Sequence, residues 1–397
     1  MSSVSFEKMK LLAIKLGGGV FTPLFIVAIY FSTSLAIIIS GVLGLIWLFS
    51  AQFKGLPSTL KRNSVAAWSL LLFLCLIVGL CYGNASNSEA IAMLSKYREL
   101  IIIPVLVPFL ATEQQRGWAW RAFVIASVLI LLISYLMDMG ILDLNRQGDP
   151  TFKSRITHSI FISFFAFFCA HKAYDGRAYE KLYWVLFILC VYNLFFIVEG
   201  RTGQVIAVLL VLLFGVQRLT KKVLLITVLS MSLFLAFFST FSDKATRINE
   251  GVVNIQSDLK AGDEQSQSSM GQRYMFWRYS LKLIAEKPLL GHGTGSFAKE
   301  YRRVAINEQL MATNPHNEFL MIGVQLGLVG LSIYLGFLAS QYYCAKKLPD
   351  KEKWLAQGLL LSLIITSIFN SPILDHTEGH WFATMIALCF SPLQAKK

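Results

Sequence analysis

Apolar runs separated by short polar segments fill most of the chain. A transmembrane helix needs about 20 predominantly apolar residues, and runs of this kind predict about 12 spans. One early run is too long for a single helix, and hydroxyl residues at 32–34 divide it. The chain is therefore predicted to be an all-α polytopic membrane protein, with two spans within 17–50 and further spans at 65–82, 90–110, 122–139, 156–170, 182–198, 204–216, 223–241, 316–343, 354–369 and 380–390.

One long polar segment, residues 241–315, interrupts this pattern. Its composition predicts a large loop that is helical over about 271–286 and then enters a glycine-rich turn at Gly291–Gly295. The chain accordingly divides into helices 1–9 within residues 1–240, the loop at 241–315, and helices 10–12 within residues 316–397.

The end of this loop carries the first candidate for chemistry. Asn314 suits a helix N-cap, and Pro315 suits the first helical position because its missing N–H has no partner there. His316 is then expected in the first turn of the tenth helix, at the water interface. A helix N-terminus disfavours the imidazolium, so the ring is expected to be neutral and able to accept a proton.

Composition supports the membrane assignment. Hydrophobic residues make up 55% of the 397 residues, charged residues make up 15%, and the mean hydropathy is +0.58. The net charge of +13 does not indicate nucleic-acid binding, because many basic residues lie in short loops between apolar runs. The six cysteines lie in or beside apolar runs without the spacing of metal ligands, so no disulfide framework and no zinc site are expected.

Lys and Arg gather in alternate short loops, which predicts the orientation of the chain. The basic side holds both termini and the loops at 54–62, 116–121, 172–181, 218–222 and 346–353. Both termini are therefore predicted to be cytoplasmic. The large loop, Arg201 and His316 then face the opposite side, which in a bacterium is the periplasm.

Two arginines on this outer side are candidates for binding an anion. Arg201 lies between glycines where two apolar runs meet, and an arginine that anchors a helix end by snorkelling is the alternative interpretation. In the predicted loop helix, Arg273 and Trp277 share a face, whereas Arg278 points about 140° away from Arg273. At most one of Arg273 and Arg278 is therefore expected to face a common site.

Two further motifs lack the context that their chemistry needs. The glycine-rich turn follows a helix and Pro288 rather than a strand, so it does not match a dinucleotide fingerprint. His376 and His380, beside Asp375, would need a helix in order to converge on a metal ion. Gly379 lies between them and the segment is predicted to be a loop, so no metal site is expected.

The outward motifs resemble those of the O-antigen ligase family, whose C-terminal half is shared with O-antigen polymerases and bacterial protein O-oligosaccharyltransferases. The resemblance covers about residues 191–330. It rests on Gly200-Arg-Thr-Gly203, Arg273-Tyr-Met-Phe-Trp277, Lys287-Pro-Leu-Leu-Gly-His-Gly-Thr-Gly-Ser-Phe297 and Pro315-His316-Asn317-Glu318-Phe319-Leu320. It implies a metal-independent transferase of the GT-C type, without a cofactor, in the bacterial inner membrane.

The resemblance also implies a reaction. Such ligases transfer a finished polysaccharide from undecaprenyl diphosphate to lipid A-core oligosaccharide at the periplasmic face. By position, the essential residues of the family fall on Arg201, Arg273 and His316. The arginines would bind the diphosphate without a metal, and the histidine would deprotonate an acceptor hydroxyl that inverts the anomeric carbon. Further candidates for contact with the diphosphate or the acceptor are Arg278, Gly293, Lys299 and Asn317.

Two other functions remain as alternatives. An O-antigen polymerase or protein O-oligosaccharyltransferase would use the same lipid-linked donor and differ in the acceptor. A secondary transporter would show inverted repeats with interrupted helices at matched positions of two halves. The sequence shows no such symmetry, and its candidate polar residues lie at one membrane interface.

Overall fold

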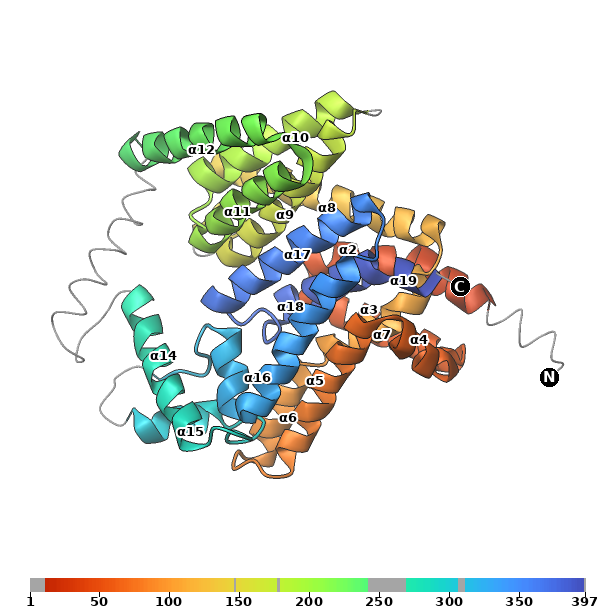
Figure 1. Ribbon diagram of the computed structural model, residues 1–397, viewed down its shortest axis with the longest axis vertical. Helices are drawn as coiled ribbons and strands as arrows, with labels where there is room; N and C mark the ends of the chain where they lie inside the picture. The colour runs from red at the N-terminus through yellow and green to blue at the C-terminus, as the bar shows by residue number, and fades with distance from the viewer. Residues whose placement is uncertain (1–10, 146–147, 177–178, 242–268, 306–310, 396–397) are drawn as a thin grey trace.

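The computed structural model describes residues 11–145, 148–176, 179–241, 269–305 and 311–395. All regular secondary structure in these ranges is helical, which confirms the predicted all-α class (Figure 1). Eight of the described helices are long and apolar enough to cross a membrane, or nine if one bent pair counts as a span. The chain is thus a multi-pass membrane protein, whereas the predicted number of about 12 spans is not confirmed.

The first part of the chain leads to the large loop. Ser32 separates its first two spans, and its hydroxyl accepts a hydrogen bond from Leu35 N at 3.2 Å, so the predicted division is confirmed. The elements of this part are η1 (Gly17–Phe21), α2 (Thr22–Phe31), α3 (Thr33–Phe49), η2 (Gln52–Gly55), α4 (Leu56–Arg62), α5 (Ser64–Leu80), α6 (Asn87–Lys96), α7 (Glu99–Leu106), η3 (Val107–Leu110), α8 (Glu113–Asp138), α9 (Arg155–Tyr174), α10 (Glu180–Tyr192), η4 (Asn193–Ile197), α11 (Arg201–Arg218) and α12 (Lys221–Phe241).

The second part holds the described loop helices and the C-terminal spans. The helix predicted over about 271–286 is confirmed, while residues 242–268 of the predicted loop lie outside the described residues. The elements of this part are α14 (Ser269–Glu286), α15 (Phe297–Val304), α16 (Glu318–Ala345), α17 (Asp350–Phe369), α18 (His376–Phe390) and α19 (Pro392–Ala395).

The predicted span at 90–110 is wrong as a single helix. Helix α6 ends at Lys96, a new helix begins at Glu99, and the 3-10 turn η3 follows it. Two prolines explain why the second piece is short, because Pro104 lies inside α7 and Pro108 inside η3, and proline has no N–H to donate. Glu99 therefore begins a short internal helix instead of lying in the middle of a span.

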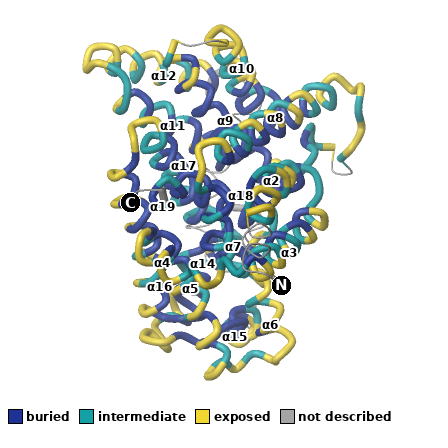
Figure 2. Tube along the Cα trace, turned by 90° about the vertical axis from the view of Figure 1, so that its right-hand side faces the viewer, coloured by how far each residue is buried: buried dark blue, intermediate teal, exposed yellow. Residues whose placement is uncertain are grey.

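Helix α9 is mostly buried among its neighbours (Figure 2). Of its apolar window, 89% is buried, and it packs against α8, α10, α11 and α17. Phe161 and Phe164 contact the Trp381 ring of α18, with ring centroids 4.8 and 5.5 Å apart. Helices α9 and α18 therefore belong to one core, and they bring polar residues near their ends together.

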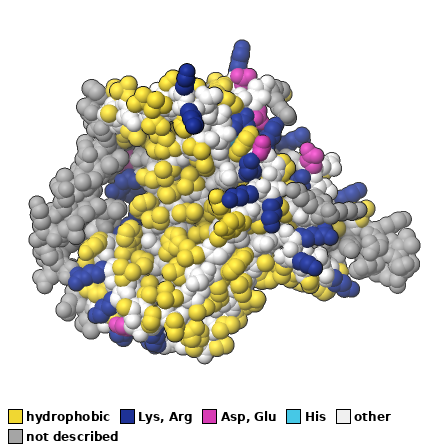
Figure 3. Space-filling model, viewed as in Figure 1, with side chains coloured by type: hydrophobic (Ala, Val, Ile, Leu, Met, Phe, Trp, Pro, Cys, Tyr) yellow, Lys and Arg dark blue, Asp and Glu magenta, His cyan; other side chains and the backbone are white. Residues whose placement is uncertain are grey.

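The two described ends of the chain lie on one side of the molecule, and a loop helix lies on the other. Helix α19 and the first described turns are on the right of Figure 1, and α14 is on the far left. Apolar side chains cover the middle of this view, and Lys and Arg side chains are frequent on its right (Figure 3). This arrangement agrees with the predicted orientation, in which the identity of the cytoplasmic face stays a prediction.

The glycine-rich turn is an internal joint between helices. Gly291–Gly295 packs where α16 bends at Gly327, whose φ is 62°. The N–H of Gly293 donates to Gln325 O at 2.8 Å. A Cβ on Gly293 would lie 2.1 Å from the Cα of Gly83, so the joint has no room for a side chain there. The turn therefore fastens the loop helices to α16 and to the segment that follows α5.

Candidate functional site

His316 lies immediately before helix α16. The helix starts at Glu318, and Asn317 caps it by accepting a hydrogen bond from Leu320 N at 3.0 Å. The prediction that Asn314 is the cap and His316 is in the first turn is therefore wrong, because Asn317 caps the helix and both residues lie before it. His316 adopts a positive φ of 51°, a conformation in which histidine is more frequent than most side chains.

Asn314 instead stabilises the turn that contains His316. Its Oδ1 accepts hydrogen bonds from His316 N at 2.9 Å and from Ser371 Oγ at 2.8 Å. An asparagine side chain bonded to the backbone two residues later is characteristic of a tight turn. The half-buried His316 ring also stacks on Phe276 of α14, with centroids 6.3 Å apart. The loop end, α14 and the segment after α17 thus all meet at this histidine.

A chain of hydrogen bonds fixes the tautomer of His316. Asn370 Nδ2 donates to Glu378 Oε2 at 3.1 Å, which leaves Asn370 Oδ1 facing His316 Nδ1 at 3.3 Å. Because an amide oxygen only accepts, Nδ1 of the ring carries the proton and donates it. Thr157 Oγ1 donates to the other carboxyl oxygen of Glu378 at 3.1 Å. The lone pair of His316 is therefore on Nε2, where it can take up a proton.

The surroundings of His316 favour its neutral form. Burial lowers the pKa of His316 from its ordinary value, and the positive charge of Arg273 lowers it further, while the hydrogen bond with Asn370 acts in the opposite direction. A ring that is neutral at pH 7 is ready to act as a base.

Helix α14 places Arg273 beside this histidine. Trp277 Nε1 donates to Pro315 O at 3.0 Å, and Phe276 is buried. Arg273 is three and four residues before these two anchors, so it lies on the same side of the helix. Burial lowers the pKa of Arg273, and the charge of Arg201 lowers it as well. The two arginines are therefore close enough for their charges to repel each other.

Arg201 is the first residue of α11, and the glycines around it have a packing role. A Cβ on Gly200 would lie 2.4 Å from Ser159 Oγ, and one on Gly203 would lie 2.3 Å from Ser159 Cβ. Glycine at both positions lets α11 begin in close contact with α9, which fixes where the exposed Arg201 emerges. The three residues predicted to be catalytic come from α11, α14 and the turn before α16, and Arg273 interacts electrostatically with both Arg201 and His316.

The four further substrate-binding candidates have different surroundings, and their roles stay predictions. Arg278 is exposed on α14. Asn317 caps α16 and also donates through Nδ2 to Ile368 O at 3.1 Å. Lys299 Nζ donates to Asn84 O at 2.5 Å, and Gly293 lies in the internal joint described above. The geometry therefore favours structural roles for Asn317, Lys299 and Gly293.

Sequence reasoning missed the residues that support His316 from behind. Asn370 directly follows α17, Glu378 lies in the first turn of α18, and Thr157 lies near the start of α9. Each is a polar residue at the end of an apolar run, which is a weak signal in the sequence. The distance between them in sequence hides that they meet in space.

Comparison with known proteins agrees with the predicted resemblance. Residues 185–335 match the family described as O-Antigen ligase. An uncharacterized protein from Haemophilus influenzae is 26% identical over 205 residues, which cover 48% of this chain and 51% of that protein. A candidate polysaccharide ligase from Rickettsia conorii is 24% identical over 148 residues, covering 34% of this chain and 36% of that protein.

A second candidate polysaccharide ligase, from Rickettsia bellii, is 32% identical over 79 residues, which cover 18% of this chain and 19% of that protein. The chain thus spans about half, or less, of the length of the curated relatives that it matches. The matched region contains Arg201, Arg273 and His316, but neither Asn370 nor Glu378. Through residues 185–335, the chain is similar to the O-antigen ligase family.

Proposed function

We propose that the chain is a glycosyltransferase that transfers O-antigen polysaccharide from undecaprenyl diphosphate to lipid A-core oligosaccharide. The observation that carries this proposal is the pair of arginines, Arg201 and Arg273, whose charges repel each other beside the neutral His316. Two guanidinium groups held near each other suit an anion with several charged oxygens, because arginine binds phosphate oxygens in a bidentate manner. The diphosphate of the donor is such an anion, and the matched family supports the same assignment.

The reaction then proceeds in one displacement. An acceptor hydroxyl gives its proton to Nε2 of His316 while its oxygen attacks the anomeric carbon of the donor sugar. The bond from that carbon to the diphosphate oxygen breaks, and the bonding electrons leave with the diphosphate. Arg201 and Arg273 stabilise the charge that develops there, because guanidinium groups bind phosphate oxygens in a bidentate manner. Attack from the side opposite the leaving group inverts the anomeric carbon.

The transfer step itself needs no metal ion, because the arginines supply the positive charge that a divalent ion provides in other phosphate sites.

The enzyme is of the GT-C type and lies in the bacterial inner membrane with both termini in the cytoplasm. Its active site faces the periplasm, where both lipid-linked substrates are displayed.

Deleting the chromosomal copy from cells that make this chain tests the acceptor. We expect lipid-linked polymer to accumulate beside bare lipid A-core, and expression of the wild-type chain to restore the long-chain product. The measurement is gel separation of the lipopolysaccharide, with analysis of the undecaprenyl-linked fraction. A core bearing single repeat units would indicate a polymerase, and unchanged lipopolysaccharide would indicate neither; both results contradict the proposal.

Replacing Asn370 with alanine tests how His316 is positioned. The loss of one hydrogen bond to the imidazole should lower kcat by about 10-fold. The bond with Asn370 raises the pKa of His316, so its removal should also move the acid limb of kcat/KM to lower pH.

Ser371→Ala is the control for this variant, because it removes a bond to Asn314 from the same segment without touching the ring. It should leave the acid limb in place. A purely structural role for Asn370 would lower kcat in the variant without moving the limb.

A further inference from the structure

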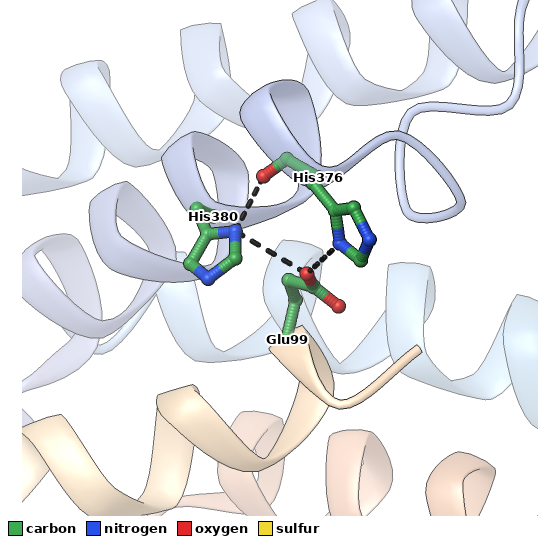
Figure 4. Close-up of side chains that lie close together, drawn as sticks. All are labelled: Glu99, His376 and His380. Atoms are coloured by element: carbon green, nitrogen blue, oxygen red, sulfur yellow. Dashed lines mark hydrogen bonds and ion pairs between the residues drawn. The ribbon is translucent and has the colours of Figure 1, made fainter. Parts of the chain in front are cut away.

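Glu99, His376 and His380 form a buried cluster in the part of the chain that the structure describes (Figure 4). The two histidines come from the first turns of α18 and Glu99 is the first residue of α7. The prediction that this C-terminal segment is a loop is wrong, because Asp375 caps a helix that starts at His376. Residues four apart on a helix share a face, so both imidazoles lie over the same carboxylate.

The ring nitrogens lie at hydrogen-bond or ion-pair distance from the carboxylate, and this spacing is also close to that of ligands around one small ion. Glu99 Oε1 lies 2.9 Å from His376 Nδ1 and 3.2 Å from His380 Nδ1. With metal–ligand bonds of about 2.0–2.1 Å, neighbouring ligands of a tetrahedral zinc ion lie about 3.3 Å apart. His380 Nδ1 also hydrogen-bonds to the carbonyl oxygen of His376 (Figure 4), so a metal ion bound at this nitrogen would replace the proton in that bond.

Burial leaves polar atoms of this cluster without partners. The side chains of Glu99 and His380 are each 1% exposed, and neither Glu99 Oε2 nor His380 Nε2 has a hydrogen-bond partner among the described residues. An unpaired buried carboxylate oxygen costs free energy, and an ion bound by both oxygens of Glu99 would give Oε2 a partner. The His376 side chain is 32% exposed, which gives an ion a way in from the surface.

We propose that Glu99, His376 and His380 bind one divalent transition-metal ion of the zinc type. Two imidazoles and one carboxylate favour zinc over magnesium or calcium, which prefer oxygen ligands. The carboxylate offsets part of the charge of the ion. Other charged groups that act on the cluster are Arg98 and Asp375, which have opposite signs.

A second group of potential ligands differs, because its carboxylates already have charged or hydrogen-bonding partners. Glu286, His292 and Glu300 also lie close together. Both of these carboxylates are paired with Arg303, and Glu300 also accepts a hydrogen bond from Asn84. Their charge is already compensated by protein groups, so this second group is not proposed as a metal site.

The ion would tie α7 to the start of α18. The same turn of α18 carries Glu378, which bonds Asn370 behind His316. The ion therefore acts on the shape of the site and takes no part in the transfer step. The proposed ligands lie outside the matched residues 185–335, and the proposal does not rely on the transfer reaction.

Metal titration of the purified full-length protein in detergent tests this site. After removal of metal with a chelator, Co²⁺ should bind at one equivalent per chain and give the visible absorption bands of a tetrahedral nitrogen–oxygen site. Zn²⁺ should displace Co²⁺ and raise the unfolding temperature. His376→Ala, His380→Ala and the isosteric Glu99→Gln should each weaken binding at least 10-fold and remove the thermal shift, as for loss of one of three ligands.

Glu286→Gln is the matched control, because it removes a carboxylate from the second cluster, and it should bind like wild type. Glu99→Gln keeps the volume of the side chain, so a normal elution profile for that variant separates lost binding from lost folding. Less than half an equivalent of bound metal in the wild type would overturn the proposal. Binding that is equally strong in the three ligand variants would overturn it as well.

Discussion

Replacing His316 with alanine should lower polysaccharide transfer by about 10²–10⁴-fold while donor binding is retained. The reason is that Nε2 of His316 carries the free lone pair in the tautomer whose Nδ1 donates to Asn370 Oδ1. The arginines that hold the diphosphate remain in this variant. The measurement compares the initial rate of transfer with the affinity for lipid-linked donor, at matched protein levels in the membrane.

A second variant separates chemistry from backbone conformation. His316 has a positive φ, and asparagine tolerates this region better than alanine does. His316→Asn therefore keeps the turn but has no base, so it should be as inactive as His316→Ala. Full transfer by either variant would eliminate the histidine as the base, and lost donor binding in His316→Asn would make it a ligand of the diphosphate instead.

The same assignment predicts the pH dependence of the wild type. The pKa of His316 is lowered from its ordinary value of 6.5, and the neutral ring is the active form, so activity holds from neutral pH down to below 6.5. It falls only when the pH passes through the lowered pKa and the ring becomes protonated. The acid limb should appear in kcat/KM, which reports on the free enzyme.

Replacing either Arg201 or Arg273 with lysine should lower transfer by about 10- to 100-fold. A lysine keeps the positive charge but loses the bidentate fork, and a hydrogen bond to a charged group contributes about 1.5–3 kcal/mol. Alanine at either position should cost about 10²–10³-fold. The measurements are initial rate and donor affinity, since the arginines act on the bound diphosphate and on the leaving group.

Stability provides an independent readout for these arginines. Burial lowers the pKa of Arg273, and the charge of Arg201 lowers it as well, so both disfavour the charged guanidinium. Arg273→Gln should therefore leave the unfolding temperature close to that of wild type while activity is lost.

Arg278→Ala is the control on the same helix, and it should have a mild effect on transfer. If Arg278 is essential and Arg273 is dispensable, the assignment of the diphosphate site to Arg273 is wrong.

The membrane character and most helices could be predicted from hydrophobic patterning alone. The division at Ser32 follows from a capping hydroxyl, and the helix over about 271–286 lies in a stretch without proline. The span predicted at 90–110 failed because prolines and the charged residues at 96–99 outweigh a continuous apolar run. The count of spans depends on such breaks, which the length of an apolar run alone does not reveal.

The candidate site was predicted only in part, for a physical reason. Arg201, Arg273 and His316 lie in recognisable motifs. Asn370 and Glu378 are far from His316 in the sequence, and they form a hydrogen-bonded chain with it only when the ends of α17 and α18 pack beside it. The helical state of the segment from His376 was missed because Gly379 suggested a loop. In the structure a Cβ at Gly379 would lie 3.1 Å from Ile373 O and 3.3 Å from Glu99, so this glycine permits close packing within a helix.

Reconstituted transfer tests the central claim most directly. The purified chain in liposomes would receive undecaprenyl-diphosphate-linked polysaccharide and lipid A-core oligosaccharide, and the products would be separated and the new linkage analysed. We expect polysaccharide joined to lipid A-core through an inverted anomeric carbon, with release of undecaprenyl diphosphate and no such product from His316→Asn. Growth of longer polymer on the lipid carrier, or an acceptor left unmodified by the active wild-type protein, would contradict the assignment.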